Sequence, residues 1–204
     1  MTDLLSNTLS ILALCISAVT AWLTFFRRGT VKMTQPTTIF FGPEPIGKKM
    51  PPKVFLRTLL FATSQRGRII ENMYISVARN KTVKNFNIWV YGERKQLVRG
   101  SGLFVGATGV EANHHFLTQK DDDSFRFTSG EYLIEVFAHL LGDKKRILLF
   151  SQSLEITKDM EHKLLAAPIA GIYFDWEPDL VKYSSHIDKH LSKQEVQETS
   201  GDQL

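Results

Sequence analysis

The chain has few of the residues that form cross-links or carry catalysis. Its only cysteine among 204 residues is Cys15, so no disulfide can form within a monomer. The glycine-rich stretch Gly100–Gly109 is not followed by the Lys-Ser/Thr pair of a phosphate-binding loop. Ser101 lacks the G-x-S-x-G spacing of a nucleophile elbow. These absences leave no recognised catalytic motif, and we expect no cofactor.

Charge is absent from the stretch Leu4–Phe26. A helix over these residues would be about 34 Å long, enough to cross a hydrocarbon core of roughly 30 Å. A soluble amphipathic helix would show a charged face, whereas the only polar residues here after Asn7 are Ser and Thr. Their hydroxyls can bond back to the helix backbone. The stretch therefore predicts a single transmembrane helix.

A cleaved signal peptide is the competing interpretation of this stretch. Signal peptides open with basic residues and end in a small-x-small cleavage site. Here Asp3 is the only charged side chain before the run, and no such site closes it. A lipoprotein processing site at Cys15 would need a small residue before the cysteine, where Leu14 stands. We therefore expect residues 1–28 to remain as a membrane anchor.

The residues that flank the helix predict its orientation. Arg27, Arg28 and Lys32 follow it, whereas Asp3 precedes it. The positive-inside rule then places the N-terminus outside and the large domain in the cytoplasm, with the protein in the cell membrane as a single-pass protein. Trp22, Phe25 and Phe26 are typical of an aromatic anchor at the membrane interface.

Basic residues are concentrated in the part of the sequence that follows the anchor. Nine Lys or Arg and one acid lie between Arg27 and Arg68, a net charge of +8; sixteen bases and nineteen acids follow from Ile69 to Leu204, a net charge of −3. An anionic leaflet attracts nearby basic side chains. We expect lipid-surface contact through Lys32, Lys48, Lys49 and Lys53. An ordinary solvated surface remains the alternative, and the bases are not interleaved with aromatics as in many nucleic-acid sites.

The remaining chain, residues 29–182, predicts one mainly β domain. Short strands are expected at Thr37–Phe41, Val54–Thr63, Ile69–Arg79 and Phe86–Tyr91, with a loop at Gly42–Pro52. The strongest pattern is a hairpin, in which Glu131–Leu140 alternates apolar and polar residues and Ile147–Thr157 returns. We expect its inner face to carry these residues of the second strand: Leu148, Phe150, Leu154 and Ile156.

This hairpin resembles the last hairpin of immunoglobulin-like β-sandwiches. Thr128, Gly130 and Tyr132 occupy the places where such domains carry a tyrosine whose hydroxyl bonds back to the preceding loop. Ile134 stands where antibody domains have a cysteine, and Trp89 is similar to their core tryptophan. The resemblance covers about 30 residues and implies an antiparallel β-sandwich, with no implication for function.

The chain after the hairpin predicts one short helix and a final strand. Lys158–Ala167 suits a helix with Thr157 as its cap, and Gly171–Trp176 suits a strand. Residues 183–204 turn polar and charged and predict a disordered tail.

The segment Phe86–Tyr91 is apolar on both faces. We therefore expect it to be buried between two layers; a contact surface at Trp89 and Tyr91 is the alternative.

His114 and His115 form the best candidate for a metal site. Zinc requires three or four ligands, and the acids Asp121–Asp123 follow shortly after. Neighbouring residues on a strand point to opposite faces, however, so the two histidines cannot easily bind one ion. His186 and His190 have metal-capable helical spacing, although the composition of the tail favours disorder.

Two hypotheses follow for function. The first is a membrane-anchored binding or scaffolding module that contacts the lipid bilayer and either a protein partner or its own copies, without nucleic acid. The second is a membrane-tethered, metal-dependent enzyme that uses His114 and His115. No motif favours the enzyme, so the binding module is the preferred interpretation.

Overall fold

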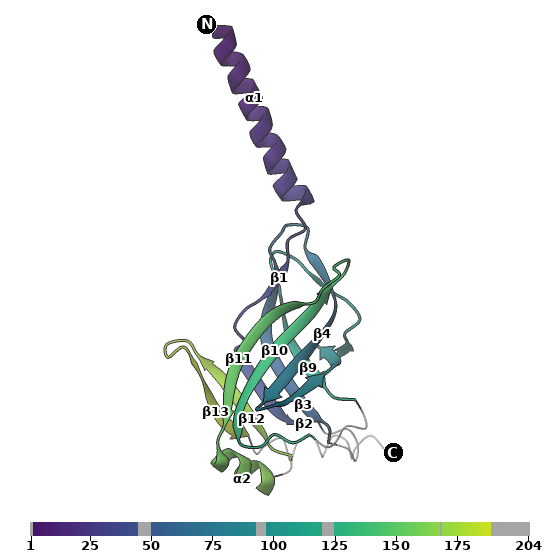
Figure 1. The fold of residues 1–204 in the computed structure, drawn as a ribbon, viewed down its shortest axis with the longest axis vertical. Helices are drawn as coiled ribbons and strands as arrows, with labels where there is room; N and C mark the ends of the chain where they lie inside the picture. The colour runs from purple at the N-terminus through teal and green to yellow at the C-terminus, as the bar shows by residue number, and fades with distance from the viewer. Residues whose placement is uncertain (1, 45–49, 93–96, 120–124, 168, 189–204) are drawn as a thin grey trace.

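An apolar helix extends from one end of a β domain (Figure 1). The computed structural model describes residues 2–44, 50–92, 97–119, 125–167 and 169–188. Helix α1, Thr2–Ala21, continues into one π-helical turn, Trp22–Phe26. The segment Leu5–Phe26 has a mean hydropathy of 2.1 and is long and apolar enough to cross a membrane. The capacity of this segment to span is therefore confirmed.

Four hydroxyl groups inside the helix donate to its own backbone. Thr20 Oγ1 donates to the carbonyl of Ile16 at 2.8 Å, and Thr24 Oγ1 donates to that of Thr20 at 2.8 Å. Thr8 and Ser10 make the same kind of bond one turn back. These residues therefore present no unsatisfied donor to lipid, as the sequence predicts.

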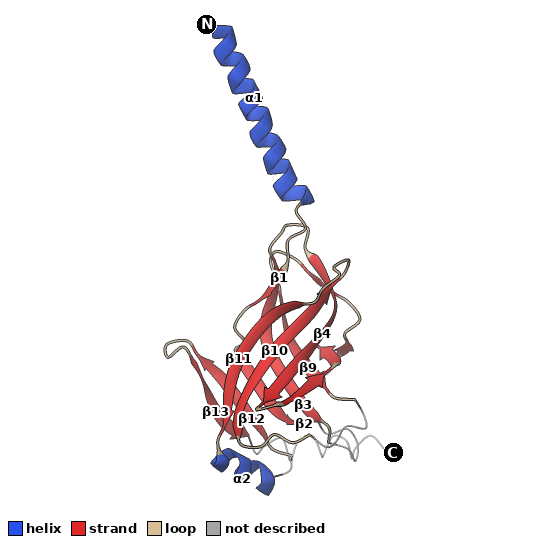
Figure 2. Cartoon of the chain, viewed as in Figure 1, coloured by secondary structure: helices blue, strands red, loops and turns tan. Residues whose placement is uncertain are grey.

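The β domain consists of two antiparallel sheets (Figure 2). The large sheet has the order β13-β12-β2-β3-β9-β6-β7, with β1 also paired to β3. Its strands are β1 (Val31–Met33), β2 (Thr38–Pro43), β3 (Pro52–Ala62), β6 (Ile88–Tyr91), β7 (Val98–Arg99), β9 (Val110–Leu117), β12 (Gly171–Glu177) and β13 (Lys182–Asp188).

The small sheet has the order β11-β10-β4-β5, with β8 also paired to β4. Its strands are β4 (Arg68–Arg79), β5 (Thr82–Phe86), β8 (Leu103–Val105), β10 (Gly130–Leu140) and β11 (Ile147–Ile156). Apolar side chains from both sheets form one core, in which the largest fully buried residues include Phe41, Phe116, Phe86 and Tyr132. The predicted mainly β fold with two antiparallel sheets is confirmed.

Strands β10 and β11 form the predicted hairpin, with one correction at Leu148. The register pairs Val136 with Phe150 and Phe137 with Leu148, so Leu149 is an extra residue. Such a bulge reverses the facing of the side chains that precede it. Phe150, Leu154 and Ile156 are buried as predicted, whereas Leu148 is exposed.

The segment Phe86–Tyr91 is two strands rather than one. Phe86 ends β5 and pairs with Ile75 in the small sheet, whereas Trp89 lies in β6 and pairs with Phe116 in the large sheet. The chain therefore crosses between the sheets at Asn87. Phe86 and Trp89 are both buried, because each faces the same core from its own sheet. This crossing explains why both faces of the segment are apolar.

The loop before β10 is closed by Tyr132. Its hydroxyl donates to the carbonyl of Thr128 at 2.8 Å and accepts from the Thr128 N–H at 2.9 Å. This is the bond that the immunoglobulin-like resemblance implies, but the immunoglobulin-like topology is not confirmed. In that fold the strands with the tryptophan and the tyrosine share one sheet, whereas here Trp89 and Tyr132 lie in different sheets.

The last described elements are α2 (Lys158–Ala166), β12 and β13. Thr157 caps α2 as predicted, because its side chain accepts from the Met160 N–H at 3.3 Å. The prediction that a disordered tail begins at residue 183 is wrong up to Asp188, because β13 pairs along its whole length with β12. Backbone pairing holds this polar strand, and composition does not reveal it. Residues 189–204 lie outside the described residues.

Replacing Tyr132 by Phe will lower the free energy of unfolding by about 1–3 kcal/mol, because the half-buried Thr128 backbone groups lose their partner. Denaturant unfolding of the full chain in detergent, followed by fluorescence, measures the effect. Tyr74→Phe is the matched control, since that ring stacks on Phe137 on the outer face of the same sheet. Equal losses in the two variants would contradict the role of the Tyr132 hydroxyl.

Candidate functional site

The helix is joined to the sandwich by a short, hydrogen-bonded connection. Ser64 Oγ donates to the carbonyl of Arg28 at 3.0 Å, and Arg68 Nη1 donates to that of Gly29 at 2.9 Å. The Thr30 N–H donates to Thr63 Oγ1 at 2.9 Å. Gly29 has φ of +61°, a conformation that suits glycine. The connection is therefore part of the folded domain rather than a free linker.

The sandwich has two different ends. We call the end beside the helix the anchor end; it consists of residues 27–30, 63–68, 104–109 and 141–146. Leu23 and Thr24 of the last helical turn line a cavity of about 310 Å³ with Ala62–Gln65 and Ala107. The loops of the anchor end therefore lie level with the end of the helix. The opposite end, which carries α2, is called the distal end (Figure 1).

The predicted aromatic and basic anchor residues all lie at the end of the helix. Trp22 and Phe26 stack with ring centroids 5.3 Å apart, and both are exposed, as is Phe25. Arg27 and Arg28 follow directly. This arrangement is the one expected for an interfacial anchor, whose contact with lipid stays a prediction.

Of the two described lysines that were predicted to contact lipid, Lys32 lies near the helix and Lys53 does not. Lys32 is exposed in β1, opposite Phe61 of β3. Lys53 begins β3, nine residues from Ala62 and so about 30 Å from the anchor end, and it forms an ion pair with Glu44. That position is beyond the screening length of about 8 Å and argues against the predicted lipid contact of Lys53. Lys48 and Lys49 lie outside the described residues.

Distant parts of the sequence supply the basic residues of the anchor end. Arg66 comes from the turn before β4 and Arg68 is the first residue of β4. The turn of the β10–β11 hairpin supplies Lys144, Lys145 and Arg146. With Arg27 and Arg28, the anchor end has seven basic residues and one acid, Asp143. Positive charge is thus concentrated at the anchor end, and the residues that supply it are partly different from those that the sequence indicated.

His114 and His115 lie on opposite faces of β9. His114 is fully buried in the core, where its Nδ1 accepts from Trp89 Nε1–H at 3.1 Å. His115 lies on the outer face of the large sheet, with its ring 5.0 Å from that of Phe55. The two side chains therefore cannot bind one ion, and the described residues contain no group of three metal-ligating side chains. Asp121–Asp123 lie outside the described residues.

Burial keeps both histidines neutral at pH 7. Desolvation, followed by the charge of His115, lowers the pKa of His114 from 6.5 to about 4. Desolvation and then Lys53 lower the pKa of His115 to about 4, against smaller opposing effects of Glu44 and the Gly92 backbone. In the neutral ring of His114 the proton is on Nε2, since Nδ1 is the acceptor for Trp89. His114 is therefore a core residue that holds β6 against β9.

Two other histidines make surface ion contacts. His139 Nδ1 lies 2.8 Å from Glu71 Oε2 across β4 and β10. His186 lies on β13, where its Nδ1 is 3.2 Å from Asp175 Oδ2. His190 lies outside the described residues. Both described contacts are explained by strand pairing.

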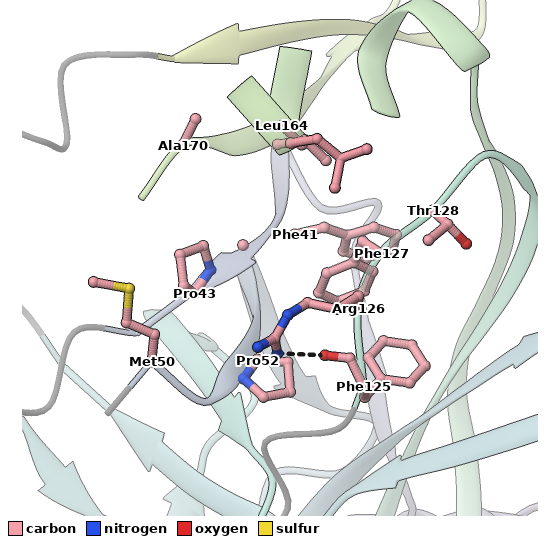
Figure 3. Close-up of a pocket in the computed structure, with 12 residues that line it drawn as sticks. Phe41, Pro43, Met50, Pro52, Phe125, Arg126, Phe127, Thr128, Leu164 and Ala170 are labelled. Carbon is pink, nitrogen blue, oxygen red and sulfur yellow. Dashed lines mark hydrogen bonds between the residues drawn. The ribbon is translucent and has the colours of Figure 1, made fainter. Parts of the chain in front are cut away.

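The distal end contains an apolar pocket of about 330 Å³ (Figure 3). It lies between the β2–β3 connection, the segment before β10 and helix α2. The described lining comprises Phe41, Gly42, Pro43, Met50, Pro52, Phe125, Arg126, Phe127, Thr128, Leu164, Leu165 and Ala170. Its inner wall is rigid, because Phe41 stacks on Phe127 at 4.7 Å and also packs against Tyr132.

Two polar groups belong to this pocket. Arg126 crosses it in Figure 3 and donates from Nη1 to the carbonyl of Phe125 at 3.1 Å; it is the only charged side chain in the described lining. Thr128 Oγ1 is buried and has no hydrogen-bond partner among the described residues. Such a cavity, mostly apolar with few polar groups, is typical of a binding site.

Sequence reasoning missed this pocket, because its walls come from four separate segments. A partial signal was present in Phe125–Phe127, where two phenylalanines flank an arginine just before the hairpin. Such alternation predicts one apolar face. Only the fold, which brings Leu164 and Leu165 of α2 to the same cavity as Phe41 and Phe127, shows that the apolar residues enclose a pocket.

Replacing His114 by Gln will flatten the pH dependence of stability between pH 6.5 and 4. The folded-state pKa of His114 lies below its unfolded value, so the unfolded chain takes up the proton first. The contribution of neutral His114 to the free energy of unfolding is complete above pH 6.5. It is lost as the pH falls toward 4, with a slope of about 1.4 kcal/mol per pH unit. Denaturant unfolding at pH 7 and pH 5 measures the slope. If the free energy of unfolding changes equally with pH in the wild-type protein and in His114→Gln, the assignment of His114 as a buried neutral base is contradicted.

Comparisons with known proteins do not identify a family. No family model matches the chain, and no curated protein matches it. Among solved structures, the chain is similar to the CooA pilin subunit from enterotoxigenic Escherichia coli, with a TM-score of 0.33 and 9% sequence identity over 62% of this chain and 98% of that chain. A likeness at this level assigns neither a family nor a function.

Proposed function

We propose that the protein is a membrane-anchored β-sandwich module that binds or scaffolds a protein partner at the cytoplasmic surface of the cell membrane. The observation that carries the proposal is the position of the apolar pocket, at the end of the sandwich opposite the membrane helix. A pocket in that position opens away from the bilayer. It is therefore available to a soluble or membrane-attached partner.

The charges of the anchor end support the cytoplasmic location. Arg27, Arg28 and Lys32 follow the helix in sequence, and Arg66 and Lys144 join them in space. Basic residues close to a membrane helix are enriched on the cytoplasmic side. The folded domain thus brings further positive charge to the side of the helix that the sequence already marked as basic.

The chemistry of the pocket indicates what kind of partner it fits. Its apolar lining suits a large apolar side chain, which is the usual anchor of a protein interface. Arg126 at the same site suits an acidic group beside that anchor. Leu165 of α2 is 72% exposed at the rim, where it would extend the contact. A peptide segment with an apolar residue next to an acid is therefore the partner chemistry we propose.

A reporter fused after Leu204 will be active only in the cytoplasm, because the basic residues lie on the C-terminal side of the helix. Paired fusions to a reporter active inside and one active outside measure the orientation in cells. Changing Arg27 and Arg28 to Glu should weaken the orientation and serves as an internal check. Activity of the wild-type fusion only on the outside would overturn the cytoplasmic location.

A photo-cross-linking side chain placed at Leu165 will capture a protein partner in cells, because Leu165 lies at the pocket rim. The same side chain at Leu180 is the matched control, since Leu180 is 56% exposed and lies in the β12–β13 turn. Mass spectrometry of the adducts identifies the captured protein, and a second copy of this chain would indicate self-association. If the same proteins were captured in equal yield at Leu165 and at Leu180, a binding role for the pocket would be contradicted.

A further inference from the structure

A second cavity lies at the anchor end, beside the membrane helix. Its volume is about 330 Å³, and basic and apolar side chains line it together. Arg28 and Arg66 enter it from the connection and from the turn before β4. Phe104 and Leu141 enter from β8 and from the end of β10, and they are 59% and 56% exposed. The described lining of the distal pocket has one basic side chain, Arg126, whereas this cavity has three, Arg28, Arg66 and Arg68.

The arginines of this cavity have different roles. Arg68 is a structural residue: it donates to the Gly29 carbonyl and lies 2.8 Å from Asp143 Oδ1 in an ion pair. Within the described part of the chain, neither Arg28 nor Arg66 has an acidic partner. Two guanidinium groups are therefore available to an anion from outside the protein.

Glycine at position 67 shapes the cavity. Gly67 has φ of +65°, and a Cβ atom there would lie 2.5 Å from the Phe104 ring. The absence of a side chain lets Phe104 lie over the turn that carries Arg66. An exposed aromatic ring and a free guanidinium are thereby brought to one side of the domain.

The level of the cavity relative to the apolar span follows from the connection between the helix and the domain. Arg28 is two residues beyond Phe26, the last residue of the apolar span. The helix end is also level with the loop Thr63–Gln65. A side chain at this level lies in the headgroup region when the span occupies the hydrocarbon core. Arg66, one residue past that loop, has the same depth.

We propose that this cavity binds the headgroup phosphate of an anionic phospholipid in the leaflet on the side of the β domain. Arg28 and Arg66 donate to the phosphate oxygens, a pairing that guanidinium geometry favours. Phe104 and Leu141 contact the glycerol and upper acyl chain. The exposed apolar residues and the continuity with the helix distinguish a lipid from free phosphate as the occupant.

This inference rests on the membrane anchoring in the proposed function, but it holds for either orientation of the chain. Lys144 and Lys145 add positive charge nearby without lining the cavity. The bound phosphate would fix the orientation of the sandwich relative to the membrane, with its distal pocket turned away from the lipid.

The test measures lipid selectivity of the full chain. The protein is reconstituted in nanodiscs containing equal amounts of phosphatidylglycerol and phosphatidylcholine, and the lipids that it retains on release are counted by native mass spectrometry. We expect enrichment of phosphatidylglycerol. The double variant Arg28→Gln/Arg66→Gln should lose about 30-fold of this preference, the effect of two basic residues at an anionic surface.

Lys158→Gln/Lys163→Gln is the charge-matched control, because both lysines lie in α2 at the distal end. It should keep the wild-type selectivity. Equal selectivity of the wild-type chain and the Arg28/Arg66 variant would overturn the proposal. So would an equal loss in the α2 control, which would show an effect of net charge alone.

A second variant, Leu141→Ser, tests the apolar half of the site and stays informative if the arginine variant does not fold. It should lower retention of phosphatidylglycerol. An excess of inorganic phosphate should not displace the lipid from the wild-type chain. Full displacement by phosphate, or unchanged retention in Leu141→Ser, would overturn the lipid assignment. A reversed orientation in the reporter experiment would leave these results unchanged, so the two proposals fail separately.

Discussion

The short, hydrogen-bonded connection between the membrane helix and the sandwich is the constraint on which the rest of the arrangement depends. Backbone carbonyls of Arg28 and Gly29 accept from Ser64 and Arg68, so the helix end and the loops of the domain form one unit. A long flexible linker would leave the domain free to turn any surface toward the lipid. Here the connection fixes which end of the sandwich lies beside the helix and which end lies opposite it.

This constraint gives the two cavities different surroundings. The cavity at the anchor end combines Arg28 and Arg66 with exposed apolar side chains beside the end of the helix. The distal pocket is almost wholly apolar and is walled by the Phe41–Phe127 stack. A mixed basic and apolar surface suits an anionic lipid, and an apolar cavity suits an anchoring side chain of a protein. The difference in chemistry thus matches the difference in position.

Neutral burial of His114 shows why a motif needs its structural context. Two adjacent histidines with acids nearby suggest a metal site in a sequence, but a strand directs neighbouring side chains to opposite faces. One histidine became a hydrogen-bond acceptor for Trp89 inside the core, and the other joined an aromatic contact with Phe55 outside it. The enzyme hypothesis therefore loses the pair of ligands on which it was built.

The sequence alone determined the elements whose signals are local. The uncharged run, the alternation of Glu131–Leu140, the cap at Thr157 and the tyrosine bond to Thr128 all depend on neighbours within a few residues. Tertiary structure alone decided the rest. The crossing at Asn87, the bulge at Leu149 and the pairing of polar β13 depend on strands far away in the chain. The charge around the end of the helix was decided in the same way, because β3 carries Lys53 away from the anchor end while two distant turns bring Arg66 and Lys144 to it.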